Sequence, residues 1–142
     1  MTVVLDLATV RSFFPDVTHL AKSGADTTAQ GHPSATRSAL YESADGTKRV
    51  TISVDRYGTD SGAAAAYALA LQKSEAVSGF TLLKVPQLGQ RTFAGTVTQS
   101  GETHIGIGVL MGKLVVGTTL AGFNASHSSI SRLVSMSRAE IA

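Results

Sequence analysis

Imidazole side chains are the first candidates for chemistry, because histidine titrates near neutral pH and also binds metals. The chain has four of them, His19, His32, His104 and His127, and no cysteine. No two histidines stand three or four residues apart, the spacing that places two ligands on one helix face. The lack of cysteine excludes disulfides, thiolate zinc sites and cysteine nucleophiles. The sequence therefore predicts no metal site and no cofactor.

His104 stands out because of the residues that share its strand face. It opens an alternating run in which His104, Gly106 and Gly108 lie on one face and isoleucine and valine on the other. After a turn, the return strand places Gly117 and Thr119 on the same nearly bare face. A sheet strip without side chains either lets a small-residue helix approach closely or leaves a groove for something else.

These glycines do not form a nucleotide-binding motif. Ile107 stands where a Walker-type loop needs glycine, and Leu114 stands where that loop needs serine or threonine. A dinucleotide-binding pattern fails because residue 111 is methionine. There is no Gly-x-Ser-x-Gly and no Ser-x-x-Lys, and the carboxylates, Glu140 included, are expected at turns, caps or exposed helix faces. No linear catalytic signature remains.

A second pair of candidates is Arg56 and Tyr57, at the end of an expected strand and before an expected helix. A guanidinium beside an aromatic ring can bind an anion or stack on a ligand. The alternative is an arginine in solvent, with Tyr57 covering the edge of the core. The candidate binding residues are therefore His104, Thr119, Arg56 and Tyr57, and no residue is assigned a catalytic role.

Length and charge restrict the class of protein. A chain of 142 residues is expected to form one domain, 1–142. Twelve Lys and Arg against ten Asp and Glu give a net charge of +2 from scattered residues, which argues against nucleic acid as a partner. No apolar run reaches the roughly 20 residues of a membrane span, and the start lacks the basic region of a leader.

The first third of the chain predicts a short helix, a loop and a hairpin. Asp6 is a plausible N-cap for a helix that ends near Phe13, since Pro15 disfavours helix in the residue before it. Residues 18–34 are small and polar without a sustained period, which predicts a mobile loop.

Two alternating runs, 36–43 and 48–57, flank Asp45-Gly46 and predict a tight hairpin. If these two residues form the turn, Tyr41 lies opposite Val50, Ala39 opposite Ile52 and Arg37 opposite Val54. Glu42 then lies opposite Arg49 as a complementary charge pair.

The remaining chain predicts two long helices and further strands. Residues 58–60 offer a cap for an alanine-rich helix that Gly79 ends. Its stripe, at residues 63, 67, 70, 71, 74 and 77, is expected to pack closely on the bare strip. Either Asn124 or Ser126 caps the last helix. Residues 80–85 and 91–98 read as strands. With the two hairpins the order is ββα-β-βββα after a short N-terminal helix. Each long helix has one apolar stripe to bury, so we expect an α+β fold: a single antiparallel sheet with both long helices on one face.

Residues 85–93, VPQLGQRTF, followed by 112–116, GKLVV, and a closing helix, resemble small exported bacterial lipoprotein and extracytoplasmic sensor-type domains of the Mog1/PsbP-like α+β kind. The resemblance covers roughly the last two-thirds of the chain. It implies this fold and an exported, periplasmic or cell-surface location with the leader removed; the alternative is cytoplasmic. It assigns no catalytic residue.

Two hypotheses about function follow. The first is a non-catalytic binding domain that presents a sheet face or the 18–34 segment to a protein or a small apolar ligand. The second is a small enzyme with a dispersed site, in which His104 is the acid or base and Thr119 or Arg56 its polar partner. Self-association into a homo-oligomer through an exposed sheet face is compatible with either.

Overall fold

We describe residues 5–27 and 34–141 in a computed structural model of the chain. Three helices and seven strands follow one another in the order α1 (Leu7–Phe13), β1 (His19–Thr27), β2 (Ala35–Glu42), β3 (Arg49–Arg56), α2 (Asp60–Glu75), β4 (Thr81–Leu83), β5 (Arg91–Gln99), β6 (Glu102–Met111), β7 (Leu114–Ala121) and α3 (His127–Ile141).

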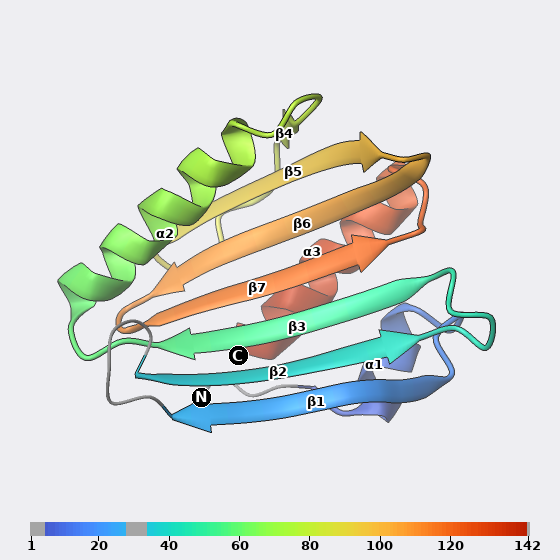
Figure 1. The fold of residues 1–142 in the computed structure, drawn as a ribbon, viewed down its shortest axis with the longest axis horizontal. Helices are drawn as coiled ribbons and strands as arrows, with labels where there is room; N and C mark the ends of the chain where they lie inside the picture. The colour runs from blue at the N-terminus through green and yellow to red at the C-terminus, as the bar shows by residue number, and fades with distance from the viewer. Residues whose placement is uncertain (1–4, 28–33, 142) are drawn as a thin grey trace.

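The strands form one antiparallel sheet in the order β1-β2-β3-β7-β6-β5-β4, which confirms the α+β class (Figure 1). α2 crosses the front of the sheet over its β5–β7 half, whereas α1 and α3 lie behind it (Figure 1). The prediction that both long helices share one face is therefore wrong. The physical reason is that the strands β5–β7 offer apolar residues on both faces, so each face can bury one helix.

The larger core lies between the sheet and the helices α1 and α3. Alternate residues of the central strands meet Val10 and Phe14 from the first helical segment and Leu133 and Met136 from α3. The fully buried strand residues of this layer include Val50, Ile52, Ile105 and Leu120. This layer supplies most of the apolar burial that stabilises the fold.

A smaller apolar cluster fixes α2 to the opposite face. Ala63 and Tyr67 of α2 pack with Tyr57 and Leu110. These two are the buried residues of α2, and both lie in its first half. The predicted stripe continued through residues 70, 71, 74 and 77, but the second half of the helix is not buried against the sheet.

β1 replaces most of the loop predicted at 18–34, so the predicted order ββα-β-βββα is wrong: three strands precede α2, not two. Residues His19–Thr27 pair with β2, with a register shift between Leu20 and Lys22. The strand is at the edge of the sheet, where residues 19–24 are all exposed, and the shift interrupts its alternation. The sequence therefore lacked the period that marks a half-buried strand. The rest of the predicted loop, 28–33, lies outside the described residues.

The register of the first hairpin is confirmed at every predicted pair, including Tyr41 opposite Val50 and Glu42 opposite Arg49. The caps are confirmed as well: Asp6 accepts from the Thr9 amide, and Thr59 accepts from the Gly62 amide at 2.9 Å. Local spacing and turn chemistry were sufficient to predict these features.

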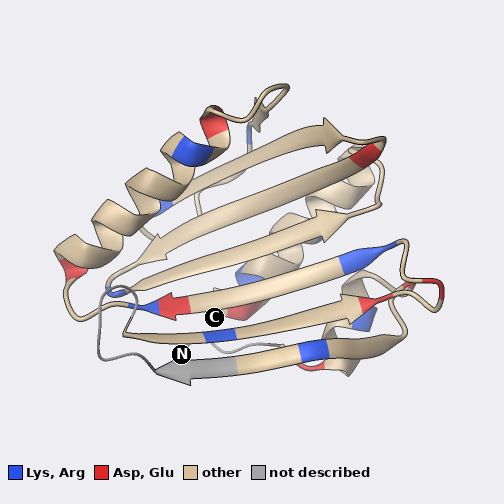
Figure 2. Ribbon diagram, viewed as in Figure 1, with Lys and Arg blue, Asp and Glu red and all other residues tan. Residues whose placement is uncertain are grey.

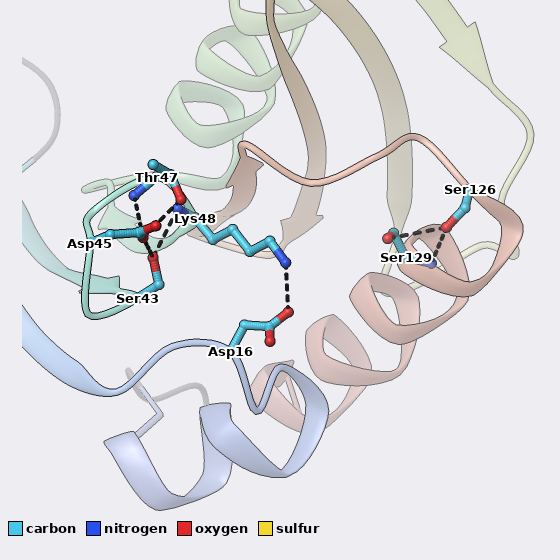
Figure 3. A network of polar contacts seen from close by, with 7 residues as sticks. All are labelled: Asp16, Ser43, Asp45, Thr47, Lys48, Ser126 and Ser129. Carbon is cyan, nitrogen blue, oxygen red and sulfur yellow. Dashed lines mark hydrogen bonds and ion pairs between the residues drawn. The ribbon is translucent and has the colours of Figure 1, made fainter.

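Side chains close the hairpin turn and tie it to the α1–β1 connection (Figure 3). One Asp45 carboxylate oxygen accepts from the Ser43 hydroxyl at 2.7 Å and from the Thr47 hydroxyl at 2.8 Å. These hydrogen bonds, the one from Ser43 first, lower the pKa of Asp45 to about 2. Lys48 then reaches Asp16 at 3.0 Å, and Ser126 caps α3 through the Ser129 amide (Figure 3).

Charged residues are sparse on the sheet (Figure 2). Within β6 and β7, Glu102 at the start of β6 is the only residue of the types Lys, Arg, Asp and Glu. None of the described helices is long and apolar enough to cross a membrane.

Glu140 is the exception to the expectation of exposed carboxylates. Its side chain is fully buried on the inner side of α3, where one carboxylate oxygen accepts from the Thr118 hydroxyl at 2.9 Å. The other oxygen has no partner among the described residues, and the same is true of the Ser137 hydroxyl. Burial raises the pKa of Glu140 to about 8, although the bond from Thr118 opposes the shift. The carboxyl group is therefore protonated in the folded protein at neutral pH.

We expect the free energy of unfolding to fall as the pH rises from about 5 to about 8. In this window the folded protein keeps the Glu140 proton that the unfolded chain has released, so stability decreases with pH. The shift sets an upper limit of about 5 kcal/mol on the loss. Urea unfolding across this range should show the slope in wild type and not in Glu140→Gln. The exposed Glu75→Gln should behave like wild type, and an unchanged slope in Glu140→Gln would contradict the assignment.

Candidate functional site

Four glycines from three adjacent strands meet on the α2 side of the sheet, and we call them the glycine block: Gly95, Gly106, Gly108 and Gly117. Gly95 lies opposite Gly106, and Gly108 lies opposite Gly117. Because side chains alternate along a strand, all four would point their side chains toward α2. A sheet without side chains over so many neighbouring positions leaves a hollow unless another group fills it.

Two phenyl rings fill half of this hollow. A Cβ atom added to Gly108 would lie 2.5 Å from the Phe93 ring, and one added to Gly95 would lie 2.0 Å from the Phe80 ring. Both distances are far below van der Waals contact, so the rings occupy the space that side chains at these glycines would take. Aromatic residues that cover glycines on a sheet in this way restore the missing packing.

Of the other two glycines, Gly106 is open, whereas the Ser53 hydroxyl partly fills the space over Gly117. A Cβ atom at Gly106 would meet nothing closer than the Thr119 hydroxyl at 3.7 Å, and one at Gly117 would meet the Ser53 hydroxyl at 3.0 Å. The prediction of a bare strip is thus confirmed for Gly106, and at Gly117 the strip is narrowed by the Ser53 hydroxyl. It is wrong for Gly108, which a cross-strand phenyl ring covers.

The open part forms a groove of about 360 Å³ between the sheet and the second half of α2. Its helix side is formed by Ala70, Ser74 and Val77, and its ends on the sheet are near His104 and Asp55. This volume is at the lower end of the range for small-molecule pockets. We call this hollow the groove.

An aromatic chain holds the wall of the groove in place. The Arg91 guanidinium lies 4.9 Å from the centre of the Tyr67 ring, and the Tyr67 ring meets Phe93 edge to face at 5.4 Å. Phe93 in turn covers Gly108. Tyr67 thereby clamps the first half of α2 to β5, while the small residues of the second half leave the groove open.

A polar cluster closes the His104 end. One Glu102 carboxylate oxygen is 3.2 Å from the His104 Nε2 atom, and the same oxygen pairs with the Arg49 guanidinium. All three side chains are about one-third exposed. The small Ala121 separates His104 from Arg49 in the register, which gives the arginine room to reach Glu102.

Arg49 therefore has a different partner from the one predicted. The hairpin register places Glu42 beside Arg49, but Glu42 lies 3.8 Å from the His19 Nε2 atom instead. The sequence could not reveal this choice. Glu102 on β6 comes close to Arg49 on β3 only because β7 pairs with both strands, and no local pattern specifies that β3 pairs with β7.

Of the four predicted binding residues, the groove brings together two. His104 and Thr119 both line it. Arg56 is exposed at the far end of β3 and, by alternation, belongs to the opposite face of the sheet. Tyr57 is buried against α2 and lines a separate hollow on the outer side of that helix.

The residues that sequence reasoning missed are Gly95, Phe93, Phe80, Glu102 and Arg49. The available signal was the short Ser100-Gly101 turn, which fixes the register of β5 against β6 and aligns Gly95 with Gly106. Nothing local predicts that Phe80, fifteen residues before Gly95, covers it.

Among the described residues, neither polar partner predicted for a catalytic His104 forms a hydrogen bond with its side chain. The His104 Nε2 atom lies 3.2 Å from Glu102, but no hydrogen bond joins His104 to Thr119 within the described residues. Arg56 is about seven residues along the sheet from Arg49 and on the other face, so it cannot partner His104. The described residues contain no cluster of three metal-ligating side chains.

Comparisons with known proteins identify the fold. No protein-family model and no curated protein matches the chain. Among solved structures, the extracellular domain of PknH from Mycobacterium tuberculosis is similar, with a TM-score of 0.66 over 96% of this chain and 95% of that chain. The sequence identity is 11%, so this likeness concerns the fold alone.

The two central glycines of β6 should respond differently to valine. Gly108→Val must displace the Phe93 ring and should cost about 1–3 kcal/mol. Gly106→Val enters open space and should change the free energy of unfolding by less than about 0.5 kcal/mol. Urea unfolding of both variants checks this difference. Equal losses would show that the groove is closed in solution.

Proposed function

We propose that this chain is a non-catalytic binding domain that holds a small, largely apolar ligand in the groove. The observation that carries the proposal is that Gly106 is left uncovered and that nothing larger than the Ser53 hydroxyl covers Gly117, beside the rings of Phe80 and Phe93. A fold whose only task was stability would gain by placing side chains at these positions, because a glycine weakens a strand. Leaving them bare preserves a space that a ligand can fill.

The composition of the groove fits an apolar occupant. Its walls are mostly phenyl, valine and alanine side chains. His104 and Asp55 stand at its two ends, and the hydroxyl groups of Ser53, Ser74 and Thr119 are spread along it. Ligand sites are commonly built in this way, with apolar walls for affinity and a few polar atoms for orientation.

We further propose an exported location, at the cell surface or in the periplasm. The support is that the similar structure is described as an extracellular domain. The kinship with lipoproteins and with Mog1/PsbP-like sensor-type domains belongs to the same proposal and rests on residues 85–93 and 112–116. Partner proteins, self-association and the extent of the domain, 1–142, stay predictions.

Filling the groove should abolish binding without unfolding the protein. Nile red, a neutral apolar dye, should show enhanced fluorescence with wild type, because the groove excludes water. Gly106→Val places two methyl groups over the open floor and should weaken dye binding at least tenfold.

Gly24→Val is the matched control. Gly24 is a strand glycine of β1, away from the groove, where an added Cβ atom would meet only the Ser38 hydroxyl at 3.6 Å. It should bind Nile red as wild type does. If Gly106→Val binds Nile red as tightly as wild type, the dye binds elsewhere, for example in the hollow outside α2, and the proposal is refuted.

A further inference from the structure

The groove carries an electrical asymmetry. Among the described residues that line it, Asp55 alone belongs to the four charged types, Lys, Arg, Asp and Glu. At the other end His104 is already engaged by Glu102, and Glu102 is neutralised by Arg49. The Glu102 charge at the His104 end is therefore compensated within the protein, whereas the Asp55 end presents a carboxylate.

No cation compensates Asp55 within the described residues. Residues 5–27 and 34–141 form no ion pair within 4.0 Å of its carboxylate and no side-chain hydrogen bond with it. Arg91 lies in the same row of the sheet but three strands away, about 14 Å, with its guanidinium over Tyr67. Lys113 is exposed at the β6–β7 turn and makes no ion pair there.

The neighbourhood of Asp55 responds to its charge. Burial, and after it the negative charge of Asp55, raise the pKa of the Tyr57 hydroxyl. On the sheet Asp55 is flanked by Val115 on β7 and by Thr36 on β2, neither of which carries a charge. A half-buried carboxylate beside apolar side chains attracts a cation more strongly than one in open water.

The positions of the charge and of the open floor specify a ligand. Asp55 is two residues from Ser53, which lies opposite Gly117, so the carboxylate is about 7 Å along the strand from the bare floor. An aromatic or other apolar body over Gly106 and Gly117 would therefore need a linker of a few atoms to bring a cation to Asp55.

We infer that the groove takes an arylalkylamine: a cationic amine paired with Asp55, joined by a short alkyl linker to an apolar ring that lies over Gly106 and Gly117, beside Phe80 and Phe93. This inference rests on the proposed function and names the class of ligand. A carboxylate at the same place would be repelled by Asp55, and a neutral head group would gain no charge pairing.

Three probes of equal length test the inference by displacement of Nile red: phenylbutylamine, phenylbutanol and phenylbutyrate. For wild type we expect the amine to bind tightest and the carboxylate weakest, with the amine about three- to fivefold tighter than the alcohol, as a partly exposed charge pair provides. Raising the salt concentration should reduce this preference, since screening weakens the pair.

Asp55→Asn should remove the preference of the amine over the alcohol and leave the affinity for the alcohol unchanged. Asp60→Asn removes the same charge from the start of α2, outside the groove, and should keep the preference. The effect of salt on the preference of wild type for the amine over the alcohol tests the charge pair without any variant.

The outcomes separate the two proposals. If all three probes displace Nile red equally from wild type, the groove binds ligands but the inference about the amine is wrong. If Asp55→Asn weakens all three probes equally, Asp55 has a structural role and the inference is likewise wrong. If neither Nile red nor any of the three probes binds, the proposed function is wrong, and the inference about the amine is wrong with it.

Discussion

The packing on the α2 side of the sheet depends on four adjacent glycines, Gly95, Gly106, Gly108 and Gly117. A sheet that lacks side chains over four neighbouring positions must be filled by other groups or stay hollow. Phe93 and Phe80 cover Gly108 and Gly95, and no side chain covers Gly106 and Gly117 in the same way. The size and place of the groove follow from this division.

The position of α2 follows from the same condition. Tyr67 contacts the Phe93 ring and Arg91, which holds the first half of the helix on β5. The second half carries Ala70 and Ser74, whose side chains are too short to reach a floor of glycines. The alanine-rich sequence that predicted close packing of helix on sheet therefore produces close packing at one end and a groove at the other.

Local signals in the sequence predicted much of the fold. The Asp45-Gly46 turn fixed the register of β2 against β3, and the Thr59 cap marked the start of α2. These local signals could not predict on which face of the sheet each helix packs, because that depends on which strands become neighbours in the sheet. β1 was missed because an exposed edge strand with an irregular register shows no alternation.

The candidate site was predicted in part for the same reason. The hairpin of β6 and β7 placed His104 and Thr119 together, and this followed from local alternation. The pairing of Arg49 with Glu102 joins β3 to β6 across β7, and the burial of Glu140 depends on Thr118 lying beneath α3. Both are contacts between distant segments, which one sequence does not reveal.

The central claim is that the open floor of the glycine block binds an apolar ligand. An amide-resolved NMR titration of the protein with phenylbutanol tests it most directly, because it locates the ligand without a variant. The account predicts saturable shifts concentrated at Gly106, Gly117 and their neighbours in the groove. Shifts confined to Gly62 and Leu69 in the hollow outside α2, or no shifts at saturating ligand, would contradict it.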